Sequence, residues 1–417
     1  MVFLEKFDAT PPEQQLPFLV GALRQDAVGF LAELRAKRPF LSVPPNVVMV
    51  TRRPDVEEVL NHNTVFTVKP YAPKMDPSVG PFMLAFDNTV FNQRDKGIMR
   101  ALIQQSDMVE VRETVAKLTK AAIASSVSTD GSLDIVAHLT RNVPVRLTGA
   151  YFGFPGPDEE SMLRWSRATQ TDMFYNVQND PAIHAACVEA GEEMKAYLQS
   201  YLPKKLDEIS NDSALDDVVA RMLKMEMPSS IGFDMSRVMT NIMGLLVGGI
   251  ETTSAAIAQA TYALLERPVE LKGAIKAAVA GDDATFNGYV WEALRFLPQS
   301  PFVGRLSEAP YKVAAGTDRA FEISLGSYVL ASHASAMNDE IAQPDVVDFK
   351  TDRPNWWYMH LGYGYHRCLG DQVSESRVPE IIKQVLLAGF TKRADGPAGE
   401  IDFKGGVFPE SFSLVKG

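Results

Sequence analysis

The strongest hydrophobic pattern in the chain lies in residues 234–266. Asp234 can serve as the N-cap of a helix, and the run 242–247 is apolar on every face. A helix that is apolar all round must be buried in the centre of a protein. Gly248 and Gly249 interrupt this pattern, although a glycine inside a helix costs about 1 kcal/mol relative to alanine. We therefore predict one long central helix whose glycines allow a flat ligand to approach closely.

Elsewhere the pattern predicts a mainly helical protein with small β regions. Residues 107–225 alternate helical periods with short Gly, Pro and Asp breaks, whereas residues 46–51 and 328–331 carry the β-branched runs of strands. Residues 69–87 are rich in Pro, Gly and Met and predict a long loop. The expected fold is a single domain over 1–417, mainly α with a small β subdomain. Its β-rich part is expected at about 40–70 and 305–335, and its helical core at about 90–300 and 368–390.

Composition narrows the class of protein. The hydrophobic content of 46% and charged content of 22% are those of an ordinary globular chain that can bury a cofactor. The net charge of −11, without any basic run, argues against a nucleic-acid partner. Two cysteines, Cys187 and Cys368, exclude a disulfide framework and fit a reducing compartment. The apolar run 16–23 is too short to cross a bilayer, so we expect a cytoplasmic protein without a membrane anchor.

Cys368 lies in the glycine-spaced loop 360–370, which reads His-Leu-Gly-Tyr-Gly-Tyr-His-Arg-Cys-Leu-Gly. Gly362 and Gly364 permit backbone conformations that a Cβ forbids, so the loop can turn tightly beneath a flat ligand. Gly370 lets a helix begin close by, and amide N–H groups directed at the sulfur favour the thiolate. A thiolate held in this way is what an axial haem ligand requires. The competing interpretation is a buried structural cysteine in a glycine-rich turn.

This loop closely resembles the cysteine-ligand loop of the cytochrome P450 family, the haem-thiolate monooxygenases. The family pattern is Phe-Gly-x-Gly-x-His-x-Cys-x-Gly, and the chain departs from it only at Leu361. The resemblance implies that Cys368 is the proximal ligand of haem b and that His366 hydrogen-bonds a haem propionate. Non-covalent binding is expected, because the chain has no Cys-x-x-Cys-His motif. The implied cofactor-binding residues are Cys368, His366, Arg100, Arg305, Lys96, Gly249, Leu361, Gly362 and Gly370.

The sequence Gly248-Gly-Ile-Glu-Thr-Thr253 matches the central-helix motif of the same family. By this resemblance, Thr252 hydrogen-bonds dioxygen at the iron and Glu251 relays protons to it. A buried acid beside an alcohol must hydrogen-bond or shift its pKa. The alternative is a glycine kink followed by a capping pair of threonines.

Further motifs have their places in the family pattern. Glu292 and Arg295 share a helix face at the i, i+3 spacing, and Arg353 supplies the third member of an expected ion network of structural role. Arg100 and Arg305 are implied to reach the haem propionates, while Lys96 stands where histidine is usual. Tentative substrate-pocket residues are Phe82, Met83, Phe86, Phe174, Gly248, Phe302, Val303 and Phe408.

The segment after the cysteine departs from the family pattern. Ser374, Glu375 and Arg377 replace the usual residues, and Pro379 is expected to kink the helix. Because this helix borders the face used by redox partners, the departures leave the partner's identity open. Basic residues near that face, Arg94, Lys96 and Arg367, are expected to receive an acidic ferredoxin.

The resemblance implies a monooxygenase that inserts one oxygen atom from O2 into a hydrophobic small molecule. Its two electrons come from a separate donor, a ferredoxin or flavodoxin with its reductase, because the chain has no flavin or iron–sulfur motif. The alternatives are a peroxide-driven haem-thiolate peroxygenase and a non-catalytic haem-binding sensor. The Glu251–Thr252 pair counts against the peroxygenase.

Overall fold

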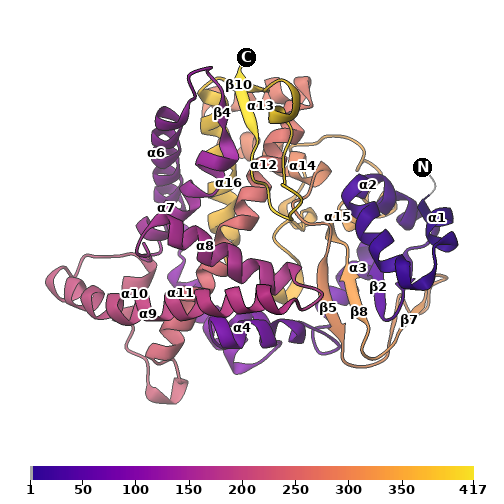
Figure 1. Cartoon of the computed structure of the whole chain (residues 1–417), viewed down its shortest axis with the longest axis horizontal. Helices are drawn as coiled ribbons and strands as arrows, with labels where there is room; N and C mark the ends of the chain where they lie inside the picture. The colour runs from indigo at the N-terminus through magenta and orange to yellow at the C-terminus, as the bar shows by residue number, and fades with distance from the viewer. Residues whose placement is uncertain (1–2) are drawn as a thin grey trace. The chain divides into compact units, whose positions relative to one another are not determined.

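The computed structural model describes residues 3–417, which divide into two compact units (Figure 1). The first unit comprises the described residues up to Pro70, then Phe86–Asn88 and Trp291–Cys368. The second comprises Tyr71–Ala85, Thr89–Val290 and Leu369–Gly417. The expected fold class, mainly α with small sheets, is confirmed, whereas a single catalytic domain over the whole chain stays a prediction.

The first unit is built on a five-stranded sheet of order β1-β2-β8-β5-β3. Only β2 and β8 are parallel in it, with Val47 opposite Tyr328, and the other pairs are antiparallel. The β-branched pattern explains β2 and β8, as expected. The strands of this unit are β1 (Phe40–Val43), β2 (Val47–Val50), β3 (Phe66–Thr67), β5 (Val303–Ser307), β6 (Tyr311–Val313), β7 (Phe321–Ile323) and β8 (Tyr328–Ala331).

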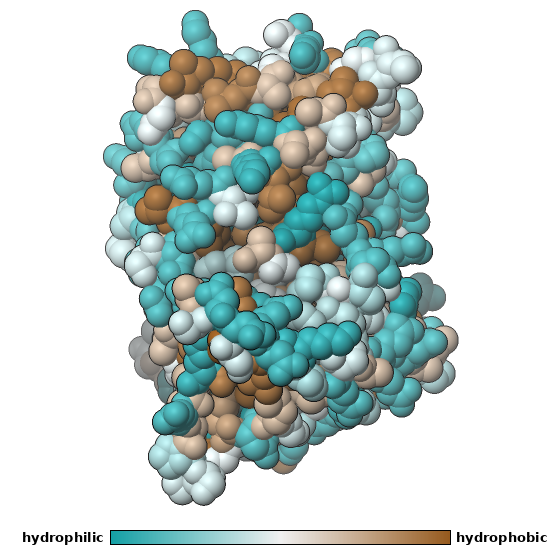
Figure 2. Space-filling view, turned by 90° about the vertical axis from the view of Figure 1, so that its left-hand side faces the viewer, coloured by the Kyte–Doolittle hydropathy of each residue, from teal (hydrophilic) through white to brown (hydrophobic). Residues whose placement is uncertain are grey.

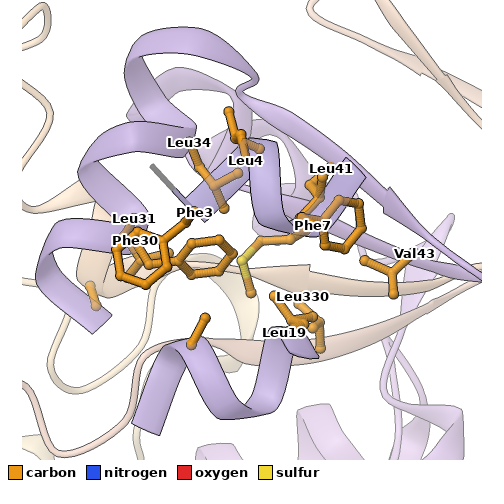
Figure 3. Packing of buried hydrophobic residues seen from close by; sticks show 13 residues of the cluster. Phe3, Leu4, Phe7, Leu19, Phe30, Leu31, Leu34, Leu41, Val43 and Leu330 are labelled. Carbon is orange, nitrogen blue, oxygen red and sulfur yellow. The ribbon is translucent and has the colours of Figure 1, made fainter. Parts of the chain in front are cut away.

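Helices cover this sheet and form the core of the first unit. Phe30, Leu31 and Leu34 recur at helical spacing and pack with β1 and β8, as Figure 3 shows. Phe3 and Phe7 join the same cluster from the first helix. The helices of this unit are α1 (Phe3–Ala9), α2 (Gln15–Lys37), α3 (Arg53–Asn61) and α15 (His333–Ala336).

The second unit is predominantly helical, with a small sheet of order β4-β10-β9. In Figure 1, α8 and α9 lie across α11, and the packing of these three helices agrees with this view. Its helices are α4 (Ala72–Ser78), α5 (Lys96–Leu102), α6 (Met108–Ser126), α7 (Asn142–Ala150), α8 (Glu159–Gln170), α9 (Pro181–Asn211), α10 (Val218–Lys224), α11 (Met235–Gly249), α12 (Glu251–Leu265), α13 (Pro268–Ala280) and α16 (Asp371–Leu387). Its strands are β4 (Leu133–Asp134), β9 (Phe390–Arg393) and β10 (Ser413–Lys416), and α14 (Asp283–Phe296) continues into the first unit.

Two local expectations need correction. The segment 69–87 is not a long loop: it contains the 3-10 turn Lys69–Tyr71, the helix α4 and the 3-10 turn Met83–Ala85. Proline at the start of α4 is compatible with this helix, because the first helical N–H groups have no intrahelical acceptor. The central helix is not continuous either: α11 ends at Gly249 and α12 begins at Glu251. Pro379 lies inside α16, and the helix continues on both sides of this proline.

The surface and the central helices are those of a folded globular unit. The face in Figure 2 is mainly hydrophilic with separate apolar patches, as is usual for folded proteins. The stretch Met235–Leu265 is long and apolar enough to span a bilayer, but 78% of its most apolar 18-residue segment is buried inside the protein. It therefore behaves as the core helix of a globular unit.

Candidate active site

The cysteine loop closes on itself around two left-handed glycines. The Cys368 amide donates to the Leu361 carbonyl at 2.8 Å, and Gly362 and Gly364 have φ of +77° and +66°. A Cβ on Gly364 would lie 2.5 Å from the Asn61 side chain, so glycine is needed for close packing on α3. Cys368 itself is half-buried and forms no disulfide. The two glycines thus shape a tight loop around a thiol that is only half-buried.

His366 binds a carboxylate of the protein itself. Its Nε2 lies 2.7 Å from Asp87 Oδ1, and Asp87 Oδ2 accepts from the Val68 amide at 2.8 Å. The sequence reasoning expected His366 to face a haem propionate and did not include Asp87. The imidazole thus faces the same chemical group, a carboxylate, that the expected role requires. Nothing in the sequence separation of these two residues indicates the contact.

The expected ion network is assembled in the first unit. Arg295 donates to both carboxylate oxygens of Glu292, at 3.0 and 2.6 Å, and Arg353 Nε donates to Oε1 at 3.0 Å. The hydroxyl of Tyr358 adds a bond of 3.0 Å. Burial alone would raise the pKa of Glu292, but the two arginines outweigh it and hold the pKa below its ordinary value. Arg353 also donates through Nη1 to Asp345 Oδ1 at 2.8 Å.

The first unit contains two buried histidines, His333 and His360. His360 is the first residue of the cysteine loop 360–370. His360 Nε2 lies 3.0 Å from the Trp291 carbonyl and must donate to it, and its ring stacks with Trp291 and Tyr358. Burial lowers the pKa of His360 to about 3 and that of His333 to about 4. Both imidazoles are therefore neutral at neutral pH.

The two buried histidines predict that the free energy of unfolding falls as the pH is lowered. In the unfolded chain these two histidines take up protons near pH 6.5, whereas in the folded protein the pKa is about 4 for His333 and about 3 for His360. The contribution of the neutral histidines to stability is fully present above pH 6.5. Below that pH the free energy of unfolding falls, by up to about 1.4 kcal/mol per pH unit for each histidine. Urea unfolding between pH 7.5 and 5 measures this slope, which His360→Phe should roughly halve. His138→Asn, at an exposed position, is the control and should leave the slope unchanged.

The break at Ile250 shapes the middle of the central helices. Thr252 Oγ1 donates to the Gly248 carbonyl at 2.7 Å, and Thr253 Oγ1 to the Gly249 carbonyl at 3.0 Å. Such bonds from threonine to the preceding turn bend helices. A Cβ added at Gly248 or Gly249 would meet no atom within 4 Å, although the flanking residues are buried. The open side of the glycines is what close approach of a flat cofactor requires.

A buried arginine of α16 binds the first turn of α12, directly after the helix break at Ile250. Arg377 of α16 is 5% exposed and donates through Nη2 to Thr253 Oγ1 at 2.5 Å. The sequence marked Arg377 only as a departure from the family pattern. The structure shows that this departure reaches the residue beside Thr252.

Glu251 is fully buried between two arginines that the sequence analysis missed. Arg141 Nη2 donates to Oε1 at 2.8 Å, and Arg167 Nη2 donates to Oε2 at 3.0 Å. Arg167 also pairs with Glu410, and the two carboxylates hold the pKa of Arg167 above its ordinary value although burial alone would lower it. Burial raises the pKa of the half-buried Tyr175 hydroxyl to about 12, and the Glu251 carboxylate adds to this shift. The expected proton-relay acid is therefore part of a network of four charges.

The arginines of this network make a testable contribution to stability. Arg141→Gln is expected to lower the free energy of unfolding by about 2 kcal/mol, because it removes a charge-assisted bond to a buried carboxylate. The matched control is Arg146→Gln, whose partner Glu159 is 42% exposed. That exposed pair should contribute less than about 1 kcal/mol. Equal losses in the two variants, measured by urea unfolding, would contradict this assignment.

The expected propionate cations occupy different environments. Arg305 is buried in β5 and donates to the Gly304 carbonyl at 2.8 Å. Arg100 is half-exposed on α5 and lies 3.8 Å from Asp371, and Lys96 is the first residue of the same helix. Arg94, expected at a partner surface, is instead largely buried and pairs with Asp95 at 2.7 Å.

The tentative pocket residues fall into several local groups. In the second unit, Phe82 packs its ring on Gly244, Phe174 lies 5.4 Å from Tyr71, and Phe408 lies 5.0 Å from Tyr175, centroid to centroid. Met83 is buried in a 3-10 turn, and Gly248 lies on α11. In the first unit, Phe302 packs against the hydrophobic cluster that contains Phe3 and Leu330. Val303 is the first residue of β5, and Phe86 is half-buried.

Comparison with known proteins identifies the class. Residues 40–388 match the family model described as Cytochrome P450. The chain belongs to the cytochrome P450 family, and it is a P450 monooxygenase like its curated relatives. Membership implies haem with a cysteine thiolate ligand. The glycine-shaped thiol loop and the open glycines of α11 fit such a group.

Relatives and solved structures agree with this placement. The chain is 25% identical to mycinamicin IV hydroxylase/epoxidase of Micromonospora griseorubida, covering 86% of this chain and 87% of the relative. It is 26% identical to vitamin D(3) 25-hydroxylase of Pseudonocardia autotrophica, covering 88% of each. The crystal structure of CalO2 superposes with a TM-score of 0.77 at 17% identity, covering 95% of this chain and 97% of CalO2. The last likeness supports the fold alone.

Proposed function

We propose that this protein inserts one oxygen atom from O2 into a hydrophobic small molecule in the cytoplasm. Two electrons come from a separate ferredoxin or flavodoxin with its reductase. The observation that carries the proposal is the Glu251–Thr252 pair, an acid and an alcohol next to the two open glycines at the break of the central helices. Oxygen activation with protons from the protein needs such groups, whereas a peroxide-driven enzyme does not.

In this proposal the chain holds haem b without a covalent bond. Cys368 would supply the thiolate ligand, and Arg100, Arg305, Lys96 and His366 would compensate the charge of the propionates. When bound, the haem supplies oxygen activation and transfer, and the thiolate favours cleavage of the O–O bond. Since His366 already binds Asp87, a propionate would share or replace that carboxylate.

The protein's own residues then manage protons. Thr252 Oγ1 donates to the Gly248 carbonyl here and must turn away from it to hydrogen-bond dioxygen. Glu251 accepts a bond from Arg141 at Oε1 and one from Arg167 at Oε2, so both of its carboxylate oxygens are held by arginines in this arrangement. We infer that proton delivery requires Arg141 or Arg167 to release Glu251. The arginines therefore control when the relay operates.

The substrate is proposed to bind among aromatic and apolar residues of the second unit. Phe82, Met83, Phe174 and Phe408 contribute from the second unit. Such lining suits hydrophobic ligands in general. The names of the relatives, which include a mycinamicin and a vitamin D(3) hydroxylase, support a bulky hydrophobic substrate.

The test is product formation with a surrogate reductase system under O2. Wild type should form oxygenated product, and Glu251→Gln should lower turnover by about 10²-fold because it removes an acid–base group. Electron consumption should fall less than product, since protons rather than electrons become limiting. Glu193→Gln is the control, because that carboxylate pairs with exposed Arg164. Turnover with hydrogen peroxide alone, unaffected by Glu251→Gln, would favour the peroxygenase.

A further inference from the structure

Gln170 is the last residue of α8 and is fully buried, yet neither atom of its amide has a hydrogen-bond partner within residues 3–417. Its neighbours on the helix are satisfied. Ser166 Oγ donates to the Leu246 carbonyl at 3.0 Å, and Thr169 Oγ1 donates to the Trp165 carbonyl at 2.8 Å. A buried amide without partners opposes folding, so a reason other than stability is needed for it.

The helical spacing places this amide on the side of α8 that faces the central helices. Residues three and four apart share a helix face. Ser166, four residues before, bonds to α11, and Arg167, three residues before, bonds to Glu251 at the start of α12. Gln170 therefore shares a face with two groups that contact the helices carrying Gly248 and Thr252.

The segment that follows Gln170 also has the features of a functional site. Directly after Gln170, the chain forms a π-helical turn, Thr171–Tyr175, and such turns occur frequently at functional sites. Phe174 and Tyr175 of this turn contact Tyr71 and Phe408, so the turn that follows Gln170 joins aromatic residues from three segments of the chain. Selective ligand sites usually combine aromatic and apolar side chains with a few polar groups that fix the orientation of the ligand.

We propose that Gln170 determines specificity by hydrogen-bonding an oxygen function of the substrate. This inference rests on the proposed monooxygenase function and narrows its substrate class. The amide offers both a donor and an acceptor. The substrate is accordingly a hydrophobic molecule that bears a hydroxyl or carbonyl group, rather than a plain hydrocarbon. Because the amide is closed off here, the ligand reaches it by displacing the π-helical turn.

Two opposite effects of one substitution test the proposal. In the ligand-free holoenzyme, Gln170→Leu removes two unsatisfied buried groups and should raise the thermal midpoint by a few degrees. The same variant should bind cyclododecanol and cyclododecanone about tenfold more weakly, measured by Soret titration, while its affinity for cyclododecane is unchanged. The control, Gln259→Leu on α12, changes the same side chain elsewhere in the second unit and should leave the ratio of affinities unchanged.

The outcomes separate this inference from the proposed function. A lower thermal midpoint, with all three ligands weakened equally, would mean that an internal water satisfies Gln170 and would overturn the inference. A wild-type protein that forms haem complex and product, with an unchanged affinity ratio in Gln170→Leu, would overturn it too. A wild type without haem binding or turnover would refute the proposed function, and the thermal midpoint would still decide the role of the amide.

Discussion

Replacing Cys368 with serine is expected to abolish oxygenation and to remove the spectroscopic signature of thiolate ligation from any haem that remains bound. A serine hydroxyl stays protonated at neutral pH and donates far less electron density than a thiolate. Activity should fall by more than about 10³-fold, since the O–O bond cleavage depends on that donation. The measurement is the Soret spectrum of the reduced carbon monoxide complex, together with product formation.

The second cysteine gives a matched control for this experiment. Cys187 is buried in α9, and burial raises the pKa of its thiol to about 11, so it stays a thiol at neutral pH. Cys187→Ala should therefore keep both the spectrum and the activity. An unchanged spectrum in Cys368→Ser would contradict the assignment of the ligand.

Removing the charge of Glu292 is expected to give the largest loss of stability. Glu292→Gln leaves the guanidinium of Arg295, which is fully buried, without its bidentate partner. Breaking a buried ion pair from one side costs about 3–5 kcal/mol. The thermal midpoint should fall by about 10 °C for a chain with units of this size. Differential scanning calorimetry of the holoenzyme measures the shift.

The control for Glu292 is a carboxylate with the same kind of partner but in water. Glu193 pairs with Arg164 at 2.6 Å, and both side chains are more than one third exposed. Glu193→Gln should lower the midpoint by at most about 2 °C, because exposed pairs contribute little. A similar loss in the two variants would show that the Glu292 network does not support the first unit.

Local patterns in the sequence predicted much of the fold. The β-branched run at 47–50 forms β2, and the apolar residues around 242–247 form a buried helix. The same patterns failed where glycine and proline were taken as signs of irregular structure. Residues 72–78 form a helix despite two prolines, because one of them lies in its first turn. The central helix breaks at Ile250, where threonines bond to the glycine carbonyls, and periodicity does not report such bonds.

The sequence by itself determined the chemical groups of the site. Cys368 with its glycines and the acid–alcohol pair are short motifs, so residue type and spacing along the chain are enough to find them. Glu292, Arg295 and Arg353 were also expected together, and the structure joins them. Only tertiary structure decided the partners of these groups: Asp87 for His366, and Arg141 and Arg167 for Glu251.

The physical reason is that such contacts join segments far apart in the chain. Arg141 and Glu251 are separated by 110 residues, and His366 and Asp87 by 279. No spacing rule connects them, and neither the burial of a charge nor an unpaired amide such as Gln170 is visible before helices pack. Motifs therefore determined which chemistry the chain carries, whereas packing decided which groups are ionised, held in place or left for a ligand.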